Sequence, residues 1–124
     1  MSVWPLDFNT PLAYSGIVFV ETPTFTRLIT ELLDDENYSQ LQTELVRNPE
    51  KGVLIAGGGG IRKIRWSLGR GHGKSSGVRI IYYHKDSKGQ ILMLFAYPKN
   101  VADNLTAGQK KILNQIAKEF YSEP

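Results

Sequence analysis

Three strand-like segments follow one another in the second half of the chain, and they constrain its fold more than any other feature. They cover residues 61–68 (IRKIRWSL), 78–83 (VRIIYY) and 90–97 (QILMLFAY). In the first segment apolar and polar residues alternate, so Trp66 faces one side of a sheet while Lys63 and Arg65 face the other. The other two segments are apolar on both sides, which is typical of central strands. The short loop KDSKG between them predicts neighbouring antiparallel strands.

Helical periodicity replaces this alternation in the first half of the chain and again near its end. After a strand-like GIVFVE, Thr22 and Pro23 provide an N-cap and a first helical residue, and an apolar stripe follows them. A second helix can begin at Asp34 or Asp35, and Thr106 with Gln109 forms a capping box for a third. The order β-α-α-β-β-β-α predicts an α+β fold with a mainly antiparallel sheet. We expect the helices to pack on one face and the other face to be partly open.

The length and composition predict a single domain preceded by an arm. The 124 residues are 41% hydrophobic and contain no cysteine, which fits a reducing compartment. Residues 1–15 show no period and contain two prolines, so we expect an N-terminal extended arm before a domain at 16–124. The apolar arm could contact a partner or cap the domain's own core. No apolar run approaches a membrane span and no signal peptide is recognisable, so we expect a cytoplasmic protein without a membrane partner.

Basic residues are concentrated where the strands are predicted. Residues 51–85 contain eight Lys or Arg and no Asp or Glu, whereas residues 31–36 contain four acidic residues. Lys63 and Arg65 would lie roughly 6.6 Å apart on one face of a strand. A hairpin would bring Arg79 close to Arg65, and such like charges repel each other unless an anion lies between them. This distribution predicts a basic face that binds nucleic acid.

These residue types suggest how such a face could also cleave RNA. Arginines stay protonated and bind phosphate oxygens, so Arg65 and Arg79 are expected to clamp a phosphate. A lysine among other cations has a lowered pKa, so Lys63 or Lys74 could transfer a proton. The RNA 2′-hydroxyl would attack the adjacent phosphate, and DNA lacks this group. His72 is a further candidate for proton transfer.

Neither a metal site nor a nucleotide triphosphate site is predicted. The two histidines, His72 and His84, have no cysteine or carboxylate partners at a metal-binding spacing, so we expect no metal and no cofactor. The glycine run at 57–60 could form a nest of backbone N–H groups around a phosphate. It lacks the Lys-Ser/Thr ending of a P-loop, and the alternative is a turn that leads into the next strand.

The order of elements and two motifs resemble the RelE superfamily of type II toxin–antitoxin toxins, with the HigB-type branch closest. The likeness covers about residues 17–120. The motif positions are Ile61 to Arg65, Gly73, Lys74, Gly77 to Tyr83, Tyr97, Lys99, Asn100, Asn104, Leu105, Gln109 and Leu113. Asn104 stands where relatives commonly have Asp. Asn100 and Thr106 replace an arginine and a tyrosine of the RelE pattern, and Tyr97 and Lys99 lie near enough to substitute for them.

The resemblance implies an mRNA interferase that cuts messenger RNA in the ribosomal A site and is neutralised by a cognate antitoxin. The implied partners are therefore the antitoxin, the ribosome and mRNA. The expected catalytic residues are Lys63, Arg65, Lys74 and Arg79. The expected RNA-binding residues are Arg62, Arg70, His72, Tyr97 and Lys99. A ParE-like toxin that poisons DNA gyrase and a non-catalytic RNA-binding protein remain alternatives on the same scaffold.

Overall fold

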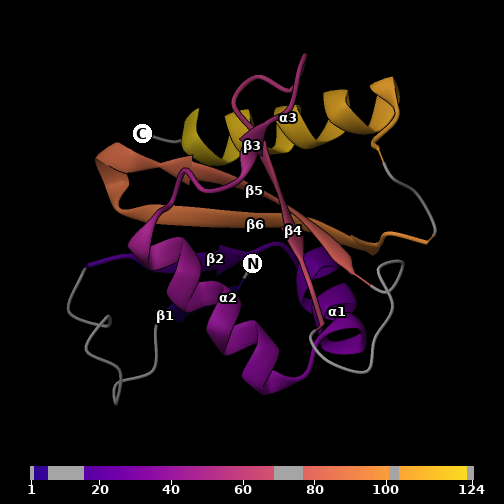
Figure 1. Ribbon diagram of the computed structural model, residues 1–124. Helices are drawn as coiled ribbons and strands as arrows, with labels where there is room; N and C mark the ends of the chain where they lie inside the picture. Colours follow the sequence, from indigo (N-terminus) through magenta and orange to yellow (C-terminus); the bar gives the residue numbers. More distant parts are fainter. Residues whose placement is uncertain (1, 6–15, 69–76, 101–103, 123–124) are drawn as a thin grey trace.

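The computed structural model describes residues 2–5, 16–68, 77–100 and 104–122 (Figure 1). Its strands are β1 (Ser2–Pro5), β2 (Val18–Glu21), β3 (Val53–Leu54), β4 (Arg62–Trp66), β5 (Val78–Lys85) and β6 (Gln90–Pro98). Its helices are α1 (Pro23–Leu32), α2 (Asp35–Arg47) and α3 (Ala107–Ser122), and a single 3₁₀ turn (Asp86–Lys88) links β5 to β6. The predicted β-α-α-β-β-β-α order is confirmed by β2, α1, α2, β4, β5, β6 and α3.

The strands form one six-stranded sheet in the order β1-β2-β6-β5-β4-β3. All neighbouring pairs are antiparallel except β2 and β6, which run parallel. The mainly antiparallel sheet and the central positions of β5 and β6 are therefore confirmed. Strands β1 and β3 are additional edge strands. Ser2–Pro5 of the predicted arm forms β1, while residues 6–15 of that arm lie outside the described residues.

The helices lie on both faces of the sheet, which corrects the expectation that they share one face. Helices α1 and α2 cover one face, and α3 crosses the other (Figure 1). The first core includes Phe25, Leu41 and Ile80, and the second includes Ile81 and Leu113. The physical reason is that β5 and β6 carry apolar side chains on both faces. Helices must cover each face to remove these side chains from water.

The helix ends follow the predicted caps. The Thr22 hydroxyl accepts a hydrogen bond from Phe25 N (3.1 Å) and donates one to Leu94 O on β6 (3.0 Å). It therefore caps α1 and also fixes this helix to the sheet. Asp34 caps α2 by accepting from Asn37 N (2.7 Å), and this backbone hydrogen bond lowers the pKa of the Asp34 carboxyl. Thr106 and Gln109 form the expected capping box of α3.

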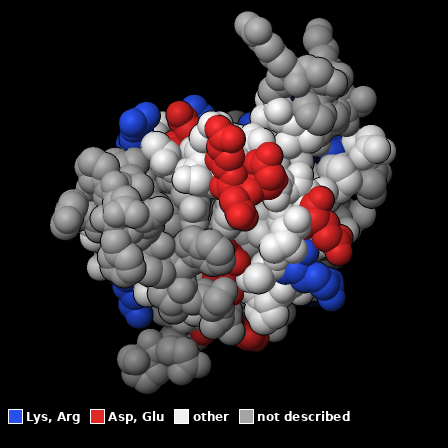
Figure 2. Space-filling model, turned by 90° about the horizontal axis from the view of Figure 1, so that it is seen from below, with Lys and Arg blue, Asp and Glu red and all other residues white. Residues whose placement is uncertain are grey.

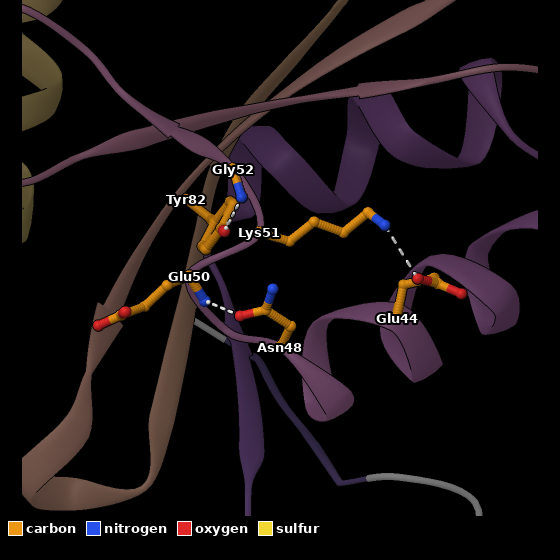
Figure 3. Close-up of polar contacts among 6 residues, drawn as sticks. All are labelled: Glu44, Asn48, Glu50, Lys51, Gly52 and Tyr82. Carbon is orange, nitrogen blue, oxygen red and sulfur yellow. Dashed lines mark hydrogen bonds and ion pairs between the residues drawn. The ribbon is translucent and has the colours of Figure 1, made fainter.

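A buried tyrosine on β5 anchors the turn between α2 and β3 (Figure 3). The Tyr82 hydroxyl donates to Pro49 O (2.7 Å) and accepts from Gly52 N (2.8 Å). A Cβ atom at Gly52 would lie only 2.8 Å from the Tyr82 ring, so this close approach requires glycine. The same turn is tied to α2 by the ion pair between Lys51 and Glu44 (3.1 Å). These contacts fix the edge strand β3 beside β4.

Candidate nucleic-acid interface

The register of β4 and β5 places two arginines directly opposite each other. Arg65 pairs with Arg79, and Trp66 pairs with Val78. The Trp66 indole packs against the core under α2 and donates from Nε1 to Asn37 Oδ1 (3.2 Å). Because side chains alternate along a strand, Arg65 and Lys63 lie on the other face, the one that α3 partly covers. The predicted proximity of Arg65 and Arg79 is confirmed.

Arg65 and Arg79 differ strongly in exposure. Arg65 is exposed, whereas Arg79 is only 4% exposed and lies between Arg65 and Tyr97 across the sheet. A Cβ atom at Gly77 would lie 3.6 Å from Arg79 Nη1, so the guanidinium lies beside this glycine at the start of β5. A permanently charged group in such a poorly screened position acts strongly on any charge nearby. The pair therefore combines an accessible guanidinium group, that of Arg65, with a neighbouring buried one, that of Arg79.

Lys63 occupies the same face two residues before Arg65. Its Nζ donates to Asn104 Oδ1 (3.1 Å), just before α3, and its side chain is partly buried. An amide positions the ammonium group without forming the ion pair that a carboxylate would form.

The remaining predicted RNA-binding residues are placed differently. Arg62 lies on the opposite face of β4, where its Nη1 donates to Glu50 O (3.1 Å) and Gly52 O (2.8 Å) and holds the turn before β3. Tyr97 is buried in the core under α3, with its ring 5.8 Å from that of Phe95. Lys99 extends the pairing of β6, because its backbone N–H donates to Gly77 O (2.9 Å). Arg70, His72 and Lys74 lie outside the described residues.

The structure adds one cation that the sequence reasoning missed. Lys110, in the first turn of α3, donates from Nζ to Ala56 O (3.2 Å) in the loop after β3. It lines the same cavity as Lys63. The helical pattern of residues 107–122 gave no sign of this placement, because it depends on α3 crossing the same face as Lys63.

The glycine run after β3 forms a turn. Ile55 N donates to Ile61 O (3.0 Å) and Gly58 N donates to Ile55 O (2.9 Å), so the loop closes the β3–β4 hairpin. Gly57, Gly59 and Gly60 have positive φ angles, which glycine adopts readily. These contacts favour the interpretation of the run as a turn that leads into β4.

Acidic side chains are grouped on the side of the molecule that carries α1 and α2. Figure 2 views the molecule from the side on which α1 and α2 lie in Figure 1, and acidic side chains are grouped there. The exposed acidic residues of these helices and the link between them include Glu31, Asp34, Asp35 and Glu36. An anionic ligand is therefore disfavoured on this side and favoured at Lys63, Arg65 and Arg79.

Within the described ranges no group of three or more His, Cys, Asp or Glu residues is arranged to hold a metal ion. No helix in this part of the chain has both the length and the apolar character that crossing a bilayer requires.

The chain is similar to a solved structure, and a family model matches most of its length. A solved structure of a mutant E. coli toxin RelE in the free state is 17% identical to the chain, with a TM-score of 0.49. The match covers 68% of this chain and 85% of that one. The family model described as the RelE toxin of the RelE/RelB toxin–antitoxin system matches residues 20–123. The chain therefore belongs to the RelE toxin family and is a toxin of a toxin–antitoxin system, for which the family implies an antitoxin partner.

Proposed function

We propose that this toxin is an mRNA interferase of the HigB-type branch. It would be a metal-independent endoribonuclease that cuts messenger RNA in the ribosomal A site and so inhibits translation. The observation that supports this most is the opposed pair Arg65–Arg79, with Lys63 on the same face of β4. The Cα atoms of the two arginines are only ~5 Å apart, because the residues lie directly opposite each other on antiparallel strands. An anion between or above them can interact with both guanidinium groups.

The arginines in this proposal stabilise charge that develops on the scissile phosphate. Attack by the 2′-oxygen forms a new bond to phosphorus and gives a phosphorane whose oxygens carry additional negative charge. The exposed Arg65 guanidinium donates hydrogen bonds to these oxygens. Arg79 is buried behind it and adds positive potential that water screens poorly. Both groups favour the transition state over the ground state because the phosphate charge increases during the reaction.

Lys63 is the proposed general acid. Its ammonium group is held by Asn104 Oδ1, and an ammonium group can only donate. A proton from Lys63 Nζ passes to the leaving 5′-oxygen as the bond between phosphorus and that oxygen breaks. The products are a 2′,3′-cyclic phosphate and a 5′-hydroxyl. The 2′-hydroxyl proton leaves to a base, and Lys74, which lies outside the described residues, is the candidate from the sequence.

The same basic face suggests how the toxin is controlled. A cognate antitoxin would neutralise it by covering this face with an acidic segment or by preventing entry into the ribosome. The proposed place of action is the cytoplasm, where translation occurs. The division into an arm at 1–15 and a toxin domain at 16–124 also stays a prediction.

Primer extension on mRNA from cells that express the chain tests this function. The informative variants are Lys63→Met and Arg65→Gln, because both side chains reach solvent and neither forms the core. The matched control is Lys88→Met, which removes an exposed cation from the link between β5 and β6. We expect discrete cuts in the parent and the control, and a loss of about a hundredfold or more in either site variant.

Other outcomes identify the alternative functions. Toxicity with intact mRNA and a DNA-damage response would indicate a ParE-like gyrase poison. Intact mRNA without toxicity would indicate a non-catalytic RNA-binding protein. Either result would refute the proposed function.

A further inference from the structure

A cavity of about 340 Å³ lies at the edge of the sheet, where β3, β4 and the start of α3 meet. The residues that matter for its chemistry are Val53, Leu54, Leu105, Lys63, Asn104 and Lys110. They combine apolar walls with two ammonium groups and one amide. None of the described residues that line the cavity is acidic. Its volume falls within the range of about 300–1,000 Å³ that is usual for small-ligand sites.

The apolar wall is unusually open to solvent. Val53 is 73% exposed and lies on the edge strand β3, where it pairs with Lys63. The strand is nevertheless held in place, because Tyr82 and Arg62 anchor the turn that precedes it. A rigid apolar surface beside cations favours a nucleotide, because the flat base can cover the apolar surface while the cations bind the phosphate.

The polar groups have fixed orientations. Because the Lys63 ammonium can only donate, Asn104 must present its Oδ1 to it, and the amide NH₂ points elsewhere as a donor. Lys110 Nζ is held by Ala56 O at 3.2 Å on another side of the cavity. The cavity therefore offers one amide donor for the edge of a base and two cations for phosphates.

We propose that this cavity binds one nucleotide of the RNA strand, next to the scissile phosphate. The base packs against Val53, which pairs with Lys63 and shares its face of the sheet. The Asn104 NH₂ donates to a carbonyl oxygen on the base edge, and Lys110 binds the neighbouring phosphate. This inference rests on the proposed function, because Lys63 belongs both to the cavity and to the cationic face of β4. The continuity through Lys63 favours an RNA nucleotide over an acidic peptide.

NMR titration of the purified full chain with nucleoside 5′-monophosphates tests the site without requiring cleavage. We expect amide shifts at residues 53–56 and 104–110, and binding about tenfold weaker for ribose 5-phosphate, which lacks a base. Lys110→Met should weaken nucleotide binding about fivefold, whereas Lys118→Met, an exposed cation later in α3, should not. Shifts confined to Arg65 and its neighbours would overturn the proposal. An equal response to an oligoglutamate peptide would also overturn it.

A second measurement separates this inference from the proposed function. Asn104→Ala should lower cleavage, because Asn104 also holds Lys63, and should change which base is preferred among the cuts that remain. Arg65→Gln should reduce cleavage at every site without changing the preferred base. A protein that cuts messages but shows no nucleotide-dependent shift in the cavity would refute the nucleotide site alone. A cavity that binds nucleotides in a protein that leaves messages intact would refute the proposed function alone.

Discussion

Replacing Tyr82 by phenylalanine removes a single oxygen atom that holds the α2–β3 turn on the sheet. The hydroxyl makes two hydrogen bonds, to Pro49 O at 2.7 Å and from Gly52 N at 2.8 Å, and the tyrosine itself is 0% exposed. Each hydrogen bond contributes about 1 kcal/mol, and a buried N–H without a partner costs about 1–3 kcal/mol. We therefore expect Tyr82→Phe to lower the free energy of unfolding by about 2–3 kcal/mol. The melting temperature should fall by about 8–12 °C for a chain of this size.

Thermal and urea unfolding, followed by circular dichroism, measure this change. The matched control is Tyr83→Phe, which removes the same atom from the next residue, whose ring packs against Tyr121 on the α3 side. The control should change stability by less than about 0.5 kcal/mol. Hydrogen exchange at Gly52 should also become faster in Tyr82→Phe. Equal stabilities of the two variants would show that the phenol does not hold the turn.

Three further predictions concern buried contacts and pH. Tyr38→Phe should cost about 1–3 kcal/mol in urea unfolding, because the buried Glu21 carboxyl loses a donor; a cost below that of Tyr83→Phe would contradict this. Gly59→Ala should destabilise the protein more than Gly57→Ala, although both glycines have positive φ. A Cβ atom at Gly59 would lie 2.3 Å from Asn114 Oδ1 on α3, whereas one at Gly57 would meet nothing within 4 Å. Equal melting temperatures of the two variants would disprove the clash. Burial raises the pKa of Tyr38 and Tyr82 in the folded protein, so on raising the pH these phenols ionise first in the unfolded chain. Their contribution to stability is therefore complete below about pH 10 and should be lost as the pH rises above it. Melting temperatures measured between about pH 8 and 11 check this, and the decline should be shallower in Tyr82→Phe.

Local patterns were sufficient to predict most elements and the placement of the basic residues on β4 and β5. Alternation in residues 61–68 separates Trp66 from Lys63 and Arg65, and the structure places these side chains on opposite faces of β4 as expected. A hairpin between two strands then leaves few registers, so the proximity of Arg65 and Arg79 followed from sequence as well. The caps at Thr22 and Thr106 are local interactions, and both were predicted.

The features that depend on long-range packing were not predictable. Nothing in the α3 pattern states which face of the sheet it covers, so Lys110 could not be linked to Lys63. Arg62 was assigned to RNA by its charge, but its hydrogen bonds to Glu50 O and Gly52 O depend on a turn that is far from obvious in the sequence. The two-residue strand β3 is too short to show a period. The cavity lined by Val53, Lys63 and Lys110 depends on all three of these features.

The parallel pairing of β2 with β6 has a consequence for synthesis. These strands are separated by the whole middle of the chain, and the Thr22 hydroxyl reaches Leu94 O, a partner 72 positions later. Contacts of such long sequence separation form late and slowly. A nascent polypeptide that ends before residue 90 carries Lys63, Arg65 and Arg79 but lacks the strand that joins them to β2. Prematurely terminated translation should therefore release a chain that cannot complete this sheet.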